Sequence, residues 1–465
     1  MSRHTVAGAA PIVALAGIVA LASAVGPRLS ATGAVVRTVT LDQSPMSVAL
    51  DWRTGRAFIA TSDANAMGGV SVFDTRSGAL LATVPLGRSV LSSAISVDEQ
   101  AGRAIVSDAN SPRVSILDAG SGRLLHTVLA GPSPGPPLVD ERAGHVLLVD
   151  QSDGSLRMLD ARTGMLLRIG SLGVTPSCTA LDSRSGRAFV GAVDGTVRVI
   201  DTRSGTLLRT IAVPTDVAAL AVDERAGRVV VIGYGDTTVY VLDAASGRLL
   251  RRVIVGMMPE SLSVDERIGR AFIVDDRTGM LGVLSTRDRM ALHTVTLPQA
   301  PGPLAVDARA GRVFVLGQGS SSVAVLDARS GALLRTVTVD RTGPGDASWV
   351  DAVVVDERRG RVLVASDNGS AARVTVLDGR SAAILRTITV PLSPIAMAMD
   401  ARSGRTVIAG APIPQRNALD VTLDDMSGLL GLALSHRSGW SLWGASNTSG
   451  SPSPSGSVSV LDVSQ

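Results

Sequence analysis

The stretch GTVRVIDTRSGTLLRTIAVPTDVAALAVDERAGRVVVIG, residues 195–233, holds four short apolar segments that are separated by turns. Two of those turns share one pattern, in which an apolar segment ends in Asp, three residues follow, and Gly comes next. Asp accepts backbone N–H groups at the start of a tight turn, and Gly adopts the positive φ that a short hairpin with a bulge requires. The pattern therefore predicts antiparallel strands joined by hairpins, with structural roles for these Asp and Gly residues.

The same unit recurs nine times along the chain, and we name its strands a (as in LAVD), b (RVFV), c (VAVLD) and d (LLRTV). A Gly lies four residues after the Asp of each strand a, and the residue after that Gly is Arg in eight units and His145 in the third. The Asp residues that end the nine a strands are Asp51, Asp98, Asp140, Asp182, Asp223, Asp265, Asp307, Asp356 and Asp400.

Four strands in a unit of about 42 residues are typical of one blade of a β-propeller. The chain therefore predicts an all-β fold, a closed β-propeller of nine four-stranded blades. Propellers usually have about four to eight blades. A ring of eight follows if the sixth unit, which has Ser285 where the other units have Asp, stands outside the ring.

Units such as residues 195–233 resemble the YVTN (YncE-like) repeats of extracytoplasmic bacterial and archaeal propellers, and the resemblance covers residues 34–410 and 457–465. The defining tetrapeptide of that family is degenerate here, with forms such as AFIV and VFVL. The Trp-Asp signature of WD40 repeats does not occur in these units, and neither a Gly-His nor a pair of glycines, as in WD40 and kelch repeats, recurs from unit to unit. The resemblance implies a propeller that lies outside the cytoplasm and binds a ligand or partner.

The two ends of the repeat region complement each other. The repeats begin with an unaccompanied d-type strand at residues 34–40, and the last unit has only strands a, b and c, at residues 395–400, 405–410 and 458–462. We expect the first strand to complete the last blade. This pairing would close the ring and remove an unpaired sheet edge, which otherwise invites aggregation.

The first 33 residues differ in composition from the repeats. Arg3 precedes an apolar run, residues 6–25, which ends in the small residues Ala22-Ser23-Ala24. This pattern indicates an export signal, and a run of this length can also span a bilayer as an uncleaved signal-anchor. Both interpretations place a single propeller domain, residues 34–465, outside the cytoplasm, secreted or at the cell surface. This segment is the only membrane contact that we predict.

The composition of the chain argues against nucleic acid binding and against an internal disulfide. All 44 basic residues are Arg, spread over the repeats, and aromatic residues make up 2% of the chain. With neither a basic run nor a set of stacking rings, nucleic acid binding is not expected. The single cysteine, Cys178, cannot form an internal disulfide, and its apolar surroundings predict a buried core residue. We expect a monomer without a cofactor.

Loop length differs between the two faces of the predicted disc. The a–b and c–d turns keep the short Asp-to-Gly spacing, whereas b–c and d–a connections vary, at residues 62–69, 340–351, 366–373 and an insertion at 411–456. The b–c and d–a connections emerge on one face, and binding residues are often carried by variable loops on a rigid scaffold. We therefore expect any binding site on that face. Tolerated drift of the loops is the other interpretation.

Six residues of these loops are the candidates for ligand or partner binding. The Trp side chains either offer an exposed aromatic contact or pack onto the disc and anchor their loops. The loop Asp carboxylates either surround a cation at the mouth of the channel or cap turns. The candidates are Trp349, Trp440, Trp443, Asp63, Asp108 and Asp367.

No catalytic residue or metal ligand set is predicted. The five His residues are scattered, and repeat position accounts for His126, His145 and His293. No His pair has zinc-ligand spacing, no Gly-x-Ser-x-Gly elbow precedes a helix, and no phosphate loop occurs. The leading hypothesis is a non-catalytic scaffold that binds an extracellular protein or glycan. The alternative, which the resemblance also allows, is a lactonase-like hydrolase or lyase that uses a divalent cation at the channel mouth.

Overall fold

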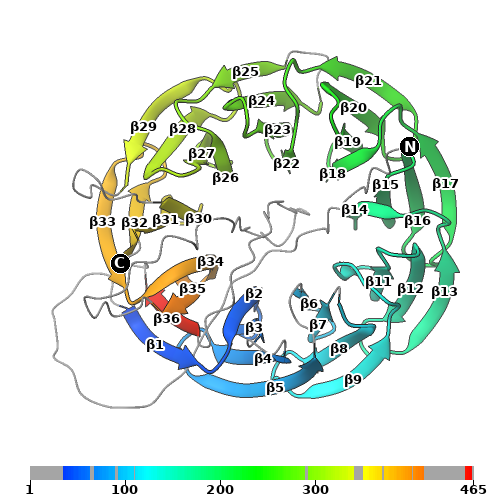
Figure 1. Cartoon of the computed structure of the whole chain (residues 1–465), viewed down its shortest axis with the longest axis horizontal. Helices are drawn as coiled ribbons and strands as arrows, with labels where there is room; N and C mark the ends of the chain where they lie inside the picture. Colours follow the sequence, from blue (N-terminus) through cyan, green and yellow to red (C-terminus); the bar gives the residue numbers. More distant parts are fainter. Residues whose placement is uncertain are drawn as a thin grey trace, which may run out of the picture.

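The computed structural model describes residues 35–62, 67–88, 93–108, 110–287, 292–339, 349–368, 371–400, 402–412 and 456–462. In this part of the chain 36 strands form nine four-stranded antiparallel sheets, and no helix occurs. Figure 1 shows the sheets arranged as blades around a central axis. The prediction of an all-β propeller with nine blades is confirmed.

Each blade has the predicted order of strands from the centre outward. The innermost strands (a) are β2 Ser44–Asp51, β6 Ser93–Asp98, β10 Leu138–Asp140, β14 Pro176–Asp182, β18 Val217–Asp223, β22 Ser261–Asp265, β26 Pro301–Asp307, β30 Trp349–Asp356 and β34 Leu392–Asp400. The second strands (b) are β3 Arg56–Ser62, β7 Arg103–Asp108, β11 His145–Val149, β15 Arg187–Ala192, β19 Arg228–Gly233, β23 Arg270–Asp275, β27 Arg312–Gly317, β31 Arg361–Asp367 and β35 Arg405–Pro412.

The third and fourth strands complete the blades, which we number 1 to 9 from the blade that contains β2. The third strands (c) are β4 Met67–Asp74, β8 Arg113–Asp118, β12 Ser155–Asp160, β16 Thr196–Asp201, β20 Thr238–Asp243, β24 Met280–Ser285, β28 Ser322–Asp327, β32 Ala372–Asp378 and β36 Gly456–Asp462. The outer strands (d) are β5 Leu80–Arg88, β9 Leu124–Leu129, β13 Leu166–Ser171, β17 Leu207–Ala212, β21 Leu249–Ile254, β25 His293–Thr296, β29 Leu333–Thr338, β33 Ile384–Val390 and β1 Val35–Leu41.

Blade 9 combines strands from both ends of the described chain. Its order is β1-β36-β35-β34, and β1 runs antiparallel to β36, with Val35 opposite Leu461 and Leu41 opposite Gly456. The sixth unit forms β22 to β25, and Ser285 ends β24 as Asp ends the other c strands. The alternative of eight blades is therefore wrong.

The repeated Asp and Gly residues make the turns that the pattern predicts. In blade 1, Asp51 Oδ1 accepts the backbone N–H groups of Arg53 and Thr54, and Gly55 donates its N–H to the Asp51 carbonyl. Gly55 has a φ of 68°, where a side chain would be strained. We call the face that carries the a–b and c–d turns the turn face, and the face that carries the b–c and d–a connections the loop face.

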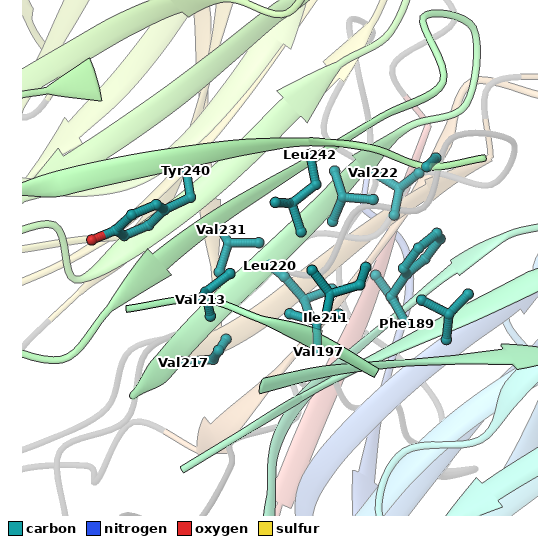
Figure 2. Close-up of a cluster of buried hydrophobic side chains, with 14 of the residues drawn as sticks. Phe189, Val197, Ile211, Val213, Val217, Leu220, Val222, Val231, Tyr240 and Leu242 are labelled. Atoms are coloured by element: carbon teal, nitrogen blue, oxygen red, sulfur yellow. The ribbon is translucent and has the colours of Figure 1, made fainter. Parts of the chain in front are cut away.

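The core lies between neighbouring blades and is built from aliphatic side chains. Figure 2 shows one such cluster, between blades 4 and 5, in which Phe189 and Val197 pack against Leu220. Cys178 belongs to the same cluster and is buried. Burial raises the pKa of its thiol to about 12, so the thiol stays protonated and acts as a small apolar group, as predicted.

Polar contacts also join neighbouring blades near the turn face. The residue after the turn Asp is Glu in several blades, and its carboxylate accepts a backbone N–H from the preceding blade, as Glu141 does from Glu99 at 2.8 Å and Glu224 from Ser183 at 2.8 Å. In a second contact, Thr286 of blade 6 donates its hydroxyl to Asp223 Oδ2 of blade 5. The turn face therefore uses many of its polar groups to hold the ring together.

Three predictions fall on residues outside the described ranges. The export segment and the insertion between β35 and β36 lie there, as do most residues of the long d–a connection before β30. Among the described residues, no helix is long and apolar enough to cross a membrane.

Candidate functional site

The structure places three of the six predicted site residues. Asp63, Trp440 and Trp443 lie outside the described residues, whereas Asp108 and Asp367 end the b strands β7 and β31 on the loop face. Asp108 and Asp367 belong to blades 2 and 8, so blades 9 and 1 separate them. The structure does not bring these two carboxylates together.

Trp349 was expected in a loop, and this expectation is wrong. It is the first residue of the innermost strand β30, opposite Asp367 in the register of the sheet. Strand β31 continues to Asp367, and β30 pairs with it as far as Trp349, with a register shift between Val350 and Ala352. Trp349 and Asp367 are thus the two predicted site residues that the fold places side by side in the backbone.

Buried Asp residues at the ends of b strands hold the loop-face connections. Asp150 Oδ1 accepts the Ser152 N–H at 2.9 Å, and its Oδ2 accepts the N–H of Ser133, in the incoming d–a connection, at 2.7 Å. Burial alone would raise the pKa of Asp150, but these hydrogen bonds hold it below its usual value. Asp108 Oδ1 likewise accepts the Asn110 N–H at 3.0 Å. These carboxylates act as turn caps.

On the loop face of blades 3 to 7, one residue occupies an equivalent position, directly after the b strand in blades 4 to 7 and after Asp150 in blade 3. A backbone hydrogen bond joins this position to the d–a connection, just before the innermost strand. Tyr234 donates its N–H to the Asp216 carbonyl at 3.0 Å, and Gln318 donates its N–H to the Ala300 carbonyl at 2.7 Å. In blade 6 the d–a connection donates the N–H instead, to strand β23. We call these residues the mouth positions, and they are Gln151, Val193, Tyr234, Asp276 and Gln318.

Side chains at neighbouring mouth positions reach each other across the blade boundary. Gln318 of blade 7 donates Nε2–H to Asp276 Oδ2 of blade 6 at 3.3 Å. Val193 and Tyr234, in blades 4 and 5, leave 45% and 52% of their surface exposed. Met258, in the d–a connection of blade 6, is 40% exposed, while Asp275 Oδ2 fixes its backbone N–H at 2.9 Å. We call Val193, Tyr234 and Met258 the apolar patch.

A pair of carboxyl groups lies next to this patch in blade 6. Asp276 is close enough to Glu260 to act on its ionisation, and Arg277 Nε lies 3.0 Å from Glu260 Oε1. Burial, the hydrogen bond to Asp276 and the charge of Asp276 raise the pKa of Glu260 to about 7, against the charge of Arg277. A neighbouring carboxylate disfavours the ionised form of a carboxyl group.

Sequence reasoning missed this pair, although one signal was present. The chain has six Glu residues, and Glu260 is the only one that does not follow a turn Asp. Tyr234 gives a similar signal, since the chain has only two Tyr residues. The other one, Tyr240, points its hydroxyl away from the core cluster in Figure 2 and donates it to Asp236 Oδ2 at 2.7 Å.

Other chemistry at the site is limited within the described ranges. Those residues contain no group of three or more His, Cys, Asp and Glu side chains that could hold a metal ion. His145 Nδ1 lies 2.9 Å from the Thr202 carbonyl of the next blade, which is a structural contact. A cavity of about 10 Å³ beside Gln299 and Ser322 has room for one water molecule.

Comparison with known proteins supports the fold. A family model described as outer membrane protein assembly factor BamB matches residues 66–193, and no curated protein matches the chain significantly. Three solved structures are similar at low identity, so they support the fold alone. They are dihydro-heme d1 dehydrogenase NirN in complex with DHE (15% identity, TM-score 0.54, 74% of each chain covered), the computationally designed Ika8 protein (19%, 0.52, 72% of this chain and 96% of that one) and Saccharomyces cerevisiae Sqt1 (13%, 0.53, 70% and 94%).

Proposed function

We propose that this chain is an extracytoplasmic propeller of the YVTN (YncE-like) type, a non-catalytic scaffold that binds an extracellular protein or glycan through its loop face. The repeats and their turns support the family, and the apolar segment at residues 6–25 supports export. The match to a family model named for an outer membrane protein assembly factor also favours a place outside the cytoplasm.

The observation that carries the proposal is the difference between the two faces. On the turn face, Asp side chains cap the turns, and Glu carboxylates accept N–H groups from neighbouring blades. On the loop face, the apolar patch and the side chain of Glu260 are exposed, and Asp276 beside Glu260 is half-buried. Exposed apolar side chains on a rigid frame favour association with a partner.

Photo-crosslinking in the cell envelope tests this proposal. A photoreactive phenylalanine analogue replaces Tyr234 on the loop face or, as the control, Arg203, which is exposed in a c–d turn of blade 4. We expect a discrete crosslinked species from position 234 and none from position 203. Crosslinks from position 203 alone, or the same products from both positions, would contradict a binding role for the loop face.

The Glu260–Asp276 pair favours one second candidate, a hydrolase or lyase that uses a divalent cation at the channel mouth. A cation that binds only the folded state must raise its stability, by about 2.7 kcal/mol at a hundredfold excess over its dissociation constant. Thermal unfolding with calcium or magnesium, compared with EDTA, measures this. A rise of the midpoint that Glu260→Gln abolishes would support the enzyme, and unchanged midpoints would oppose it.

A further inference from the structure

Building on the proposed binding role, we infer that the loop face of blades 4 to 6 binds a cationic segment of a partner protein, a stretch in which Arg or Lys stands next to a large apolar side chain. The contact surface consists of the apolar patch and the carboxylates that surround it.

The apolar patch is held ready for contact before any partner arrives. Its three residues belong to consecutive blades, whose innermost strands β14, β18 and β22 lie next to one another. Beneath the patch, Cys178 and Leu220 belong to one buried cluster and Met257 to the next. Hydrogen bonds fix the backbones of Tyr234 and Met258. A rigid apolar surface loses little conformational entropy when it binds.

Charge determines which partner suits this surface. The loop-face connections of blades 5 and 6 comprise residues 213–216, 234–237, 255–260 and 276–279. Their only basic residue is Arg277, which pairs with Glu260 and contacts the Met258 sulfur, so the carboxylates of Asp216, Asp236 and Asp276 remain for a partner. With all side chains ionised they have a formal charge of −3, although the whole chain carries +3. Their carboxylates are those of Asp216, Asp236, Glu260 and Asp276.

Blade 4 adds no competing charge to the surface. Asp194, next to Val193, forms an ion pair with Arg198 at 3.3 Å, so its charge is already compensated. Across the boundary to blade 5, Tyr234 presents an exposed ring near the acidic connections. Aromatic faces attract guanidinium and ammonium groups.

The carboxyl pair gives such a cation a defined place to bind. The charge of Asp276 acts on Glu260, Arg277 Nε lies 3.0 Å from Glu260 Oε1, and neighbouring carboxylates repel each other unless a proton or a cation compensates them. A guanidinium group donates to two carboxylate oxygens at once. A guanidinium group of the partner adds to the charge compensation that Arg277 provides at Glu260.

Peptide binding to the purified full chain tests this inference. The probe is a fluorescent peptide of alternating Arg and Leu, and its two controls carry Glu in place of Arg or Ser in place of Leu. Fluorescence anisotropy at physiological salt is expected to show binding of the Arg/Leu peptide and at least about tenfold weaker binding of both controls, which corresponds to 1.4 kcal/mol. Equal binding of all three peptides, or no binding of the Arg/Leu peptide, would overturn the inference.

Variants of the chain locate the contact. Tyr234→Ser and the double variant Glu260→Gln with Asp276→Asn are each expected to weaken binding of the Arg/Leu peptide by about tenfold or more. Asp42→Asn is the matched control, since Asp42 is exposed on the loop face between β1 and β2, away from blades 4 to 6. Equal effects of all variants would overturn the inference, and unfolding midpoints verify that each variant is folded.

The crosslinking experiment separates this inference from the broader proposal. A crosslink from position 234 to a glycan, or to a protein segment without Arg or Lys, would support the binding role of the loop face and would contradict the inference that the partner is cationic. A crosslink to an Arg-containing or Lys-containing segment, together with selective binding of the Arg/Leu peptide, would support both.

Discussion

Replacing Thr286 by Val is expected to destabilise the ring where blades 5 and 6 meet. The Thr286 hydroxyl donates to Asp223 Oδ2, and the two residues are 1% and 0% exposed. The other carboxylate oxygen, Oδ1, keeps its hydrogen bond from the Ala226 N–H at 2.8 Å. Val has nearly the same shape as Thr, so packing changes little and the lost hydrogen bond dominates. A hydrogen bond to a buried charged group contributes about 1.5–3 kcal/mol to the free energy of unfolding.

Urea unfolding measures this difference, with Thr338→Val as the matched control. Thr338 is exposed in the outer strand β29, so we expect its substitution to change stability by less than about 0.5 kcal/mol. Thr286→Val should lower the urea midpoint, and the control should not. Equal midpoints for the two variants would refute the view that this hydroxyl holds blades 5 and 6 together.

Three further changes test other contacts of the ring, each by urea unfolding. Ala161→Ser places a hydroxyl where Thr286 has one, beside the turn carboxylate of the preceding blade, and should stabilise by about 1 kcal/mol; a lower midpoint would contradict this. Burial raises the pKa of Glu266 to about 7 from 4.5. Because the folded state then binds the proton more tightly than the unfolded state, Glu266 makes the protein more stable as the pH falls from 7 to 4.5. Glu266→Gln should flatten this rise in stability. Gly164→Ala should destabilise the protein by about 1–3 kcal/mol more than Gly144→Ala. Both glycines have a φ of 72°, but only at Gly164 would an added Cβ approach another side chain, that of Ile116, at 2.7 Å. Equal losses of stability would argue against this close packing.

The number of blades and the turn residues could be predicted because they depend on local chemistry. An Asp that caps a turn and a Gly at positive φ act within five residues, as Asp51 and Gly55 do, so their spacing is visible in the sequence. The buried position of Cys178 followed in the same way from its apolar neighbours.

Features that depend on a neighbouring strand or blade were not predictable. Trp349 is in a strand because β31 continues beside it. Asp276 meets Glu260 and Gln318 only because the ring brings a d–a connection and the next blade to the same place. The Glu residues that follow turn Asp residues are visible in the sequence, but the N–H groups that donate hydrogen bonds to them belong to another blade.

Hydrogen–deuterium exchange of the full chain, with and without the Arg/Leu peptide, tests the assignment of binding to the loop face most directly. We expect the peptide to slow exchange at residues 193–195, 234–237 and 255–260, the loop-face connections of blades 4 to 6, and to leave the turn face unchanged. Slowed exchange on the turn face, or on the loop face of other blades instead, would contradict the assignment.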